Sequence, residues 1–204
     1  MKTGLFITLE GCEGSGKTTH SLLLAKTLTK KGFSVLRTRE PGGTSLAESI
    51  RKLLLRPGSK ISPLTELFLY EAARAQHTRE KILPALKRGL WVLCERYSLA
   101  TMAYQGYARR LPRTMIRTLD RIATRGLKPD LAIILDIPES EFSRRDAKRK
   151  LDRLELESEH FRRRVREGYR QLARSEKDCA LVNGRLPLAE VHKKIVRLVE
   201  RLHS

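Results

Sequence analysis

One short segment constrains the fold of this 204-residue chain more than any other, the glycine-rich octapeptide GCEGSGKT at positions 11–18. The apolar run Leu5 to Leu9 precedes it, and residues 17–31 follow with the apolar spacing of a helix. The octapeptide matches G-x-x-x-x-G-K-[ST], a pattern that belongs between a strand and a helix. Its glycines let backbone amides point at phosphate oxygens beside the positive end of the helix. The segment therefore predicts a phosphate-binding loop.

The residues of this loop have distinct predicted roles. Lys17 reaches the β and γ phosphates of a nucleotide, and the Thr18 hydroxyl is a ligand for magnesium. A glycine-rich turn without a ligand is the alternative, and the flanking strand and helix argue against it. The predicted nucleotide-binding residues are Gly11, Cys12, Glu13, Gly14, Ser15, Gly16, Lys17, Thr18 and Thr19.

Strands and helices alternate along the rest of the chain. Apolar runs predict further strands at 34–38, 90–94, 131–135 and 179–182. Helical patterns lie between them, in a segment that ends near 55 and then at 64–87, 98–105, 113–125, 139–148, 156–173 and 188–202, with Pro84 expected to kink or end the second. The order predicts a single α/β domain over residues 1–204, three-layered, with a mostly parallel central sheet of about five strands.

Composition excludes several classes of protein. No apolar run approaches the ~18 residues that cross a bilayer, and the amino terminus becomes polar too early for a signal peptide. Three cysteines without metal-ligand spacing argue against a disulfide framework or a zinc site. We therefore expect a cytoplasmic protein without a membrane partner. The formal charge of +19, from 42 basic and 23 acidic residues, fits nucleic acid, small polyanions or merely a basic surface.

Three further segments are expected at the carboxyl edge of the sheet, beside the phosphate loop. They are REPGGT at 39–44, YEAAR at 70–74 and ERYSLATMAYQG at 95–106. Together with the phosphate loop, and in this order over nearly the whole chain, they resemble the thymidylate kinase family. The resemblance implies a P-loop nucleoside monophosphate kinase fold. It also implies magnesium-dependent transfer of the γ-phosphate of ATP to dTMP, giving dTDP and ADP, in dTTP synthesis.

The resemblance also implies which residues hold the phosphate of the acceptor. Arg96 grips it, since a guanidinium offers a planar fork that lysine cannot copy. An ion pair of Arg96 with Glu40 or Glu95 is the structural alternative. Glu95 stands where the family usually has Asp, so its predicted metal contact comes from a side chain one methylene longer. Arg51 is a second candidate phosphate ligand.

The base and the sugar of the acceptor have predicted partners in the same segments. Tyr70, where the family usually has Phe, stacks on the base, and Arg74 donates to a thymine carbonyl. A core aromatic with a solvated arginine beside it is the alternative. Thr101 contacts the base edge, while Ala100 replaces a hydroxyl found in some relatives.

Three more residues complete the predicted acceptor site. Tyr104 packs against the second carbon of the sugar and leaves no room for a ribose hydroxyl. Glu13 approaches the 3′-hydroxyl. Gln105 is a candidate contact to base or sugar, although its residue type favours a surface position.

The densest basic stretch, 143–153, matches the mobile lid of these kinases, which we place at about 143–154. The phosphate loop lacks an arginine, so the bacterial-type arrangement with lid arginines is expected. The predicted catalytic residues are Lys17, Arg96, Arg144, Arg149 and Arg153, with Lys148 behind them. A solvated basic helix is the alternative for any one of the lid residues.

Two features near strand ends are less specific. Asp136 either contacts magnesium-bound water or caps the next helix, and Asn183 with Gly184 is placed to flank adenine. The arginines at 162, 163, 164 and 166 are predicted only to form part of a basic surface.

Two rival functions remain open from the sequence. One is a kinase for another nucleoside monophosphate such as UMP. The other is a nucleic-acid-binding P-loop ATPase, against which stand the 5% aromatic content and the lack of a recognisable nucleic-acid-binding motif. The expected partners are ATP, Mg²⁺, dTMP and a second copy of the chain, without nucleic acid.

Overall fold

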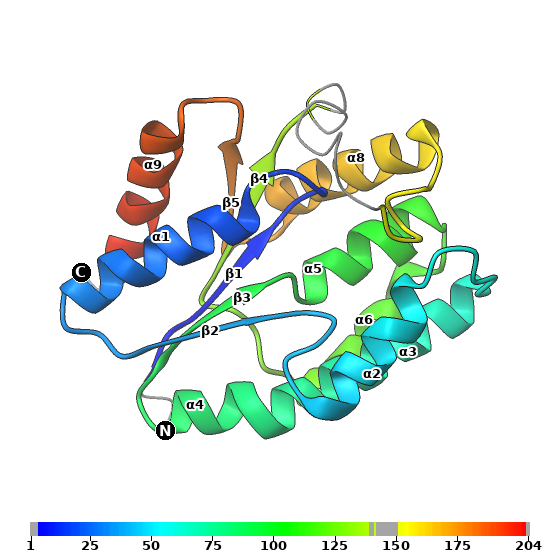
Figure 1. Cartoon of the computed structure of the whole chain (residues 1–204), viewed down its shortest axis with the longest axis horizontal. Helices are drawn as coiled ribbons and strands as arrows, with labels where there is room; N and C mark the ends of the chain where they lie inside the picture. Colours follow the sequence, from blue (N-terminus) through cyan, green and yellow to red (C-terminus); the bar gives the residue numbers. More distant parts are fainter. Residues whose placement is uncertain (1–3, 139–140, 142–150, 203–204) are drawn as a thin grey trace.

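The computed structural model describes residues 4–138, 141 and 151–202, and its centre is a single five-stranded sheet (Figure 1). The strands, in the spatial order β2-β3-β1-β4-β5, all pair in parallel. Their bounds are β1 Phe6–Glu10, β2 Val35–Arg39, β3 Trp91–Glu95, β4 Leu131–Asp136 and β5 Cys179–Asn183. The predicted α/β class and five-stranded sheet are confirmed, and the sheet is entirely rather than mostly parallel.

Helices cover both faces of the sheet. Helices α1 (Lys17–Lys30) and α9 (Leu188–Glu200) pack together on one face (Figure 1). The other face carries α4 (Leu83–Lys87) against β3 and α8 (Glu159–Ser175) against β4 and β5. Beyond the β2 and β3 ends lies a further group of helices, α2 (Ser45–Leu55), α3 (Pro63–His77), α5 (Ser98–Thr101) and α6 (Arg113–Thr124). Within the described residues, no helix combines the length and apolar character needed to cross a membrane.

The strand pleat divides the core between the two faces. Ile7, Leu93 and Ile133 pack with α1 and α9, whereas Phe6 and Val92 point to the opposite side. Successive residues of a strand point to opposite faces, so both sets are buried and the strands read as continuous apolar runs. This double burial explains why β1, β3 and β4 were recognisable in the sequence.

Two helix predictions can be compared with the structure. Pro84 does not end the helical stretch. A π-helical turn, η1 (Thr78–Ile82), joins α3 to α4 and places Pro84 in the first turn of α4, where a missing N–H costs least. The helix predicted from 156 begins at Glu159 instead, because the hydroxyl of Ser158 caps it by accepting from the Phe161 N–H at 3.2 Å. The helix predicted at 139–148 lies almost wholly outside the described residues.

A second π-helix, η2 (Met102–Ala108), continues α5 where the sequence predicted one α-helix. Its wider turn includes the last residues of the segment ERYSLATMAYQG and packs along α8. Tyr104 and Gln105 lie on η2, so the irregular turn sets the direction of two predicted site residues.

The topology brings the candidate residues together. Strand β1 lies between β3 and β4, and the phosphate loop follows its carboxyl end. In parallel α/β sheets, ligands bind at this edge, where connections leave toward opposite sides. Glu10, Glu95 and Asp136 end the three central strands there.

Candidate active site

A cavity of about 740 Å³ lies at the carboxyl edge of the sheet. It is a single continuous space, large enough for a nucleotide-sized ligand. Thirteen of the predicted residues line it: Glu13, Gly14, Gly16, Lys17, Thr18, Thr19, Arg51, Tyr70, Glu95, Arg96, Thr101, Tyr104 and Gln105. The tertiary structure thus gathers the phosphate loop and the three downstream segments around one volume.

The phosphate loop curls around the ammonium group of Lys17. Lys17 Nζ donates to the carbonyl oxygens of Gly11 at 3.1 Å and Cys12 at 2.7 Å. Gly11, Gly14 and Gly16 have φ angles of 128°, 67° and 94°, a region that favours glycine. Burial, together with the nearby charge of Arg96, lowers the pKa of Lys17 to about 8. A bound phosphate would oppose both effects and favour the charged ammonium.

Arg96 stands beneath the loop and joins it to the acceptor side. Its Nη1 donates to Gly11 O at 2.9 Å and its Nη2 to Glu13 Oε1 at 2.7 Å. The predicted alternative, an ion pair with Glu40 or Glu95, is wrong, because Glu13 is the partner. Arg96 adopts a φ of 68°, which is strained for a residue with a Cβ. Its N–H still donates to Leu9 O at 2.9 Å, so sheet pairing holds the strained residue in place.

Glu13 is held by two side chains. In addition to Arg96, the Tyr104 hydroxyl lies 2.6 and 2.7 Å from its two carboxylate oxygens. Burial alone would raise the pKa of Glu13, but Arg96, Lys17 and the Tyr104 hydrogen bond outweigh it and keep the pKa below its ordinary value. The residues predicted for the 3′-hydroxyl and for the sugar are therefore in direct contact.

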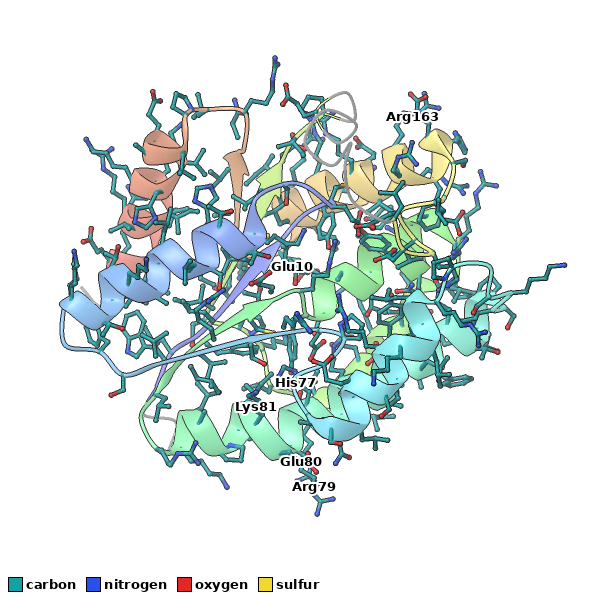
Figure 2. The ribbon with its side chains drawn as sticks, in the orientation of Figure 1. Glu10, His77, Arg79, Glu80, Lys81 and Arg163 are labelled. Carbon is teal, nitrogen blue, oxygen red and sulfur yellow. The ribbon has the colours of Figure 1, made fainter. Side chains whose placement is uncertain are left out.

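A buried carboxyl group supports this cluster from below. Glu10 lies inside the molecule at the end of β1 (Figure 2) and accepts from Tyr97 N at 2.8 Å and the Tyr169 hydroxyl at 3.1 Å. Tyr169 in turn accepts from Arg96 Nη1 at 3.1 Å. Burial raises the pKa of Glu10 to about 7. The sequence did not single out Glu10, because a carboxylate beside a phosphate loop has no pattern of its own.

Of the predicted base-binding residues, three line the cavity and Arg74 does not. The three are Tyr70, Thr101 and Gln105. Gln105 is 1% exposed, and its Nε2 donates to Glu66 Oε1 at 2.7 Å. The prediction that Gln105 favours a surface position is therefore wrong. Gln105 lies on the buried side of η2, so its polar residue type did not indicate its position.

Arg74 does not line the cavity. Its guanidinium is 2% exposed and donates to Glu40 at 2.8 Å, Glu71 at 2.8 Å and Asp120 at 3.1 Å. It also bonds to Thr101 Oγ1 and Tyr97 O, each at 2.9 Å. The alternative of a solvated Arg74 is therefore wrong, and in this structure the residue holds Thr101 at the cavity wall.

The metal prediction concerns oxygen ligands at the entrance to the loop. Thr18 Oγ1 donates to Glu95 Oε2 at 2.6 Å, so the two predicted ligands are adjacent. In the described part of the chain, no group of three or more His, Cys, Asp or Glu residues could hold a metal. A hydroxyl and one carboxylate fit Mg²⁺, which is usually bound by few protein oxygens together with phosphate oxygens and water.

The predicted contact of Asp136 with magnesium-bound water stays a prediction, and the helix that Asp136 could cap lies almost wholly outside the described residues. The Asp136 carboxylate accepts from Arg166 Nε at 2.6 Å and Nη2 at 2.9 Å. This bidentate ion pair ties α8 to the end of β4. Arg166 is therefore more than part of a basic surface, and so is Arg162, whose Nη1 donates to the carbonyl oxygens of Glu155 and Glu157.

Of the predicted lid residues, Arg144, Lys148 and Arg149 lie outside the described residues. Arg153 is 9% exposed and donates to Leu54 O at 2.7 Å and Glu66 Oε2 at 2.6 Å. It does not line the cavity, whereas its neighbours Asp152 and Leu154 do. In this structure Arg153 anchors the carboxyl end of the proposed lid to α2 and α3.

The predicted adenine residues lie beside the phosphate loop. Asn183 ends β5, and a Cβ added at Gly184 would lie 3.6 Å from Ser15 O. This position is next to the loop, although neither residue lines the cavity described above.

Several residues at the cavity were not predicted from the sequence. Arg37 on β2, Glu48 on α2 and Lys81 on η1 all line it. Lys81 Nζ donates to Gly43 O at 3.0 Å, and Figure 2 shows Lys81 and His77 on the inward side of their helix and Arg79 and Glu80 on the outward side. Spacing within REPGGT carries no information about residues from other elements that hold it.

His77 is the buried member of this group. It is 0% exposed, with Nδ1 3.0 Å from Glu40 Oε1 and Nε2 2.7 Å from Thr38 Oγ1. It thereby links the end of β2 to the carboxylate that also holds Arg74.

Together, the phosphate loop on a parallel sheet, the partly buried lysine and the facing arginine define a P-loop nucleotide kinase. Comparisons with known proteins specify the class further. A sequence model of the family described as thymidylate kinase matches residues 9–195. The chain belongs to the thymidylate kinase family, and it is a nucleoside monophosphate kinase.

Individual relatives agree over nearly their whole length. A thymidylate kinase of Carboxydothermus hydrogenoformans is 46% identical over 202 residues, which cover 98% of this chain and 99% of that protein. One of Pseudomonas fluorescens is 46% identical over 203 residues, covering 98% and 97%. The crystal structure of thymidylate kinase from Ehrlichia chaffeensis superimposes with a TM-score of 0.79 at 31% identity, covering 96% of this chain and 98% of that one.

Proposed function

We propose that the protein transfers the γ-phosphate of ATP to dTMP, giving dTDP and ADP, with Mg²⁺. The observation that carries the proposal is the continuity of the cavity, whose lining includes Lys17, Thr18 and Thr19 of the phosphate loop together with Tyr70 and Arg96 of the predicted acceptor segments. Donor and acceptor phosphates can therefore meet without crossing protein. Family membership supports the same reaction.

The chemistry asks the protein mainly for positioning and for charge neutralisation. An oxygen of the dTMP phosphate attacks the γ-phosphorus, and the bond from that phosphorus to the oxygen bridging it to the β-phosphorus breaks as ADP leaves. The attacking group is already ionised near neutral pH, because the second pKa of a phosphate monoester is about 6. A protein base is therefore unnecessary.

Side chains of the cavity have complementary proposed roles. Lys17 neutralises charge on the transferred group, Arg96 holds the acceptor phosphate, and Arg51 assists it. Arg96 would exchange part of its contact with Glu13 for the phosphate. Magnesium bound by Thr18 and Glu95 would supply further positive charge on the donor phosphates.

The remaining proposed contacts select the acceptor. Tyr70 stacks on the base, while Thr101 and Gln105 meet its polar edge. Tyr104 lies against the sugar and, with Glu13, selects the deoxy form. Arg74 is proposed to affect the base in one of two ways. It either donates to the base after its present contacts change, or it positions Thr101, to which it donates.

The lid proposal rests on charge and chain position. In this proposal the residues at about 143–154, most of which lie outside the described residues, serve as the lid, and Arg144 and Arg149 balance charge on the transferred phosphoryl group. Closure would exclude water, which competes as an acceptor. Arg153 acts in this proposal at the fixed end of the lid.

We also propose a homodimer in the cytoplasm. Large apolar side chains are exposed on α2, α3 and α6, which pack side by side (Figure 1). These residues are Leu46, Leu53, Leu64, Phe68 and Ile122. Contiguous exposed apolar patches mark association surfaces, and we propose that these side chains form one. Cys12, Cys94 and Cys179 are free thiols, which suits a reducing compartment.

The reaction is tested by ADP release from ATP and Mg²⁺ with and without dTMP. We expect release to depend on dTMP, and UMP at equal concentration to support much less. A rate that does not change with dTMP would refute the proposed function. A comparable rate with UMP would show that the acceptor, but not the fold or the chemistry, is misassigned.

A further inference from the structure

Glu66 is a buried carboxylate that the proposed mechanism does not use. It lies in the first turn of α3 and is 0% exposed, while the neighbouring helix positions Thr65 and Phe68 face solvent. An ionised group at such a depth is costly unless it is fully paired. The hydrogen-bond partners of Glu66 therefore indicate its role.

Three side chains converge on this carboxylate. Arg153 Nη2 donates to Oε2 at 2.6 Å, and Arg109 Nη2 and Nε donate to Oε2 at 3.1 Å and to Oε1 at 3.2 Å. Gln105 Nε2 completes the set on Oε1 at 2.7 Å. With two guanidinium groups against it, Glu66 acts as an acceptor at both oxygens.

This pairing determines which way the Gln105 amide points. A carboxylate has no proton to donate, so the nitrogen end of the amide must face Glu66 and the oxygen end must face away. Gln105 lines the cavity, and among the described residues its amide oxygen has no hydrogen-bond partner. The amide oxygen is also not fully buried, so it is accessible from the cavity that Gln105 lines.

An amide oxygen at the base end of the cavity discriminates between pyrimidines. Thymine and uracil carry a hydrogen on ring nitrogen N3 and can donate to it, whereas N3 of cytosine is an acceptor and is repelled. A site built to pair one polar group rejects an analogue that leaves the site unpaired.

We propose that Glu66 is a positioning residue that sets base specificity, by holding the Gln105 amide with its oxygen toward the cavity. The inference rests on the proposed function, since it assumes that the base of the acceptor lies against Gln105. It adds a residue that never touches the substrate, and it assigns Arg109 and Arg153 the role of keeping Glu66 a pure acceptor.

The test replaces Glu66 by glutamine and measures kcat/KM for dTMP, dUMP and dCMP. In E66Q the new amide can donate or accept, so the Gln105 amide can turn around. We expect the dTMP to dCMP ratio to fall by about tenfold or more. The dTMP to dUMP ratio should stay within about twofold, because both bases carry the N3 hydrogen. A merely structural role would lower all three rates together and leave both ratios unchanged.

Two further variants make the result specific. In a Gln105→Met background, E66Q should no longer change the dTMP to dCMP ratio, because there is no amide to orient. Glu157→Gln is the matched control, since Glu157 also pairs with Arg109 but does not contact Gln105. It should leave the ratio unchanged. If E66Q alone fails to fold, E66Q combined with Arg109→Gln removes one of the two cations along with the charge and gives the same ratio measurement.

The outcomes separate the two proposals. A soluble E66Q protein with an unchanged dTMP to dCMP ratio would overturn the role of Glu66 while leaving the proposed function intact. An unsubstituted protein without dTMP-dependent ADP release would refute the proposed function itself.

Discussion

At the scale of single residues, the site depends on charges that are held close together before any ligand binds. Arg96 and Glu13 are 2.7 Å apart and both are largely buried. Arg96 also occupies a left-handed backbone conformation, a strain that functional sites often contain. Its arrangement is preorganised, because the β3 ladder and the loop carbonyl of Gly11 hold it from two directions.

Replacing Arg96 by alanine should lower kcat/KM for dTMP by about 10- to 100-fold or more, through the loss of charge-assisted hydrogen bonds to the acceptor phosphate. Alanine keeps the Cβ and therefore the backbone strain. Steady-state kinetics and ATP titration measure the effect, and the Kd for ATP should change by less than about threefold. Arg117→Ala, which removes an exposed arginine of α6, is the control. Equal losses in kcat/KM for dTMP and in affinity for ATP would show that Arg96 does not bind the acceptor.

Glu10 should make stability depend on pH. Burial raises its pKa from an ordinary value near 4.5 to about 7, so the folded state binds a proton that the unfolded state has released. The contribution is present below pH 4.5 and is lost as pH rises through 7, amounting to about 3 kcal/mol. Glu10→Gln cannot ionise, so its free energy of unfolding relative to the unsubstituted protein should rise between pH 5 and pH 8.

Denaturant unfolding at several pH values measures this difference. Glu190→Gln, at an exposed position of α9, is the matched control and should show little change across the same range. A difference for Glu10→Gln that does not vary with pH would mean that the buried carboxyl does not titrate in this interval.

At the scale of elements, the acceptor side is shaped by the contact between α8 and η2. Gly168 on α8 faces Tyr107 of η2, and a Cβ added there would lie 2.8 Å from the Tyr107 Cβ and Cγ atoms. Glycine in a helix interior normally costs about 1 kcal/mol relative to alanine. The close approach therefore explains why it is present, since η2 also carries Tyr104 and Gln105.

Gly168→Ala should destabilise the protein by about 1–3 kcal/mol, because the overlap with Tyr107 outweighs the gain in helix propensity. It should also raise KM for dTMP more than KM for ATP, since the displaced element is η2. Chemical denaturation and kinetics give the two readouts. Glu167→Ala, the adjacent exposed position, should stay within about 0.5 kcal/mol. Increased stability of Gly168→Ala would contradict the packing argument.

At the scale of the whole molecule, several of the 42 basic residues are partners in internal ion pairs. Arg74, Arg96, Arg153 and Arg166 are paired with carboxylates that hold helices to the sheet or to one another. Burying a cation requires such partners, so these arginines stabilise the fold locally instead of forming a free basic surface. Because each such pair sums to zero, the net charge of +19 is carried by the other basic residues.

The proposed dimer is a property of the whole molecule as well. Phe68 is 51% exposed on α3, the helix that packs against both α2 and α6. Phe68→Glu should convert the dimer to a monomer, as measured by analytical ultracentrifugation, because a charge would then be buried at the interface. Leu188→Glu, at a similarly exposed apolar position on α9, should remain dimeric. A monomeric unsubstituted protein, or a dimeric Phe68→Glu variant, would refute the proposed surface.

Much of the fold and part of the site could be predicted from the sequence alone. The phosphate loop, the five strands and the order of the helices follow from local patterns, because double burial of parallel strands and the backbone needs of the loop act over a few residues. The identity of Lys17, Arg96, Tyr70 and Tyr104 as cavity residues came with the motifs that contain them.

Only the tertiary structure decided which groups pair with which. Arg96 pairs with Glu13 instead of Glu40 or Glu95, Asp136 pairs with Arg166, and Gln105 is buried against Glu66. These partners are 30 to 83 residues apart in the chain. Sequence patterns report local backbone geometry and burial, whereas pairing between distant side chains depends on how elements are packed, and it was this packing that determined the electrostatics of the site.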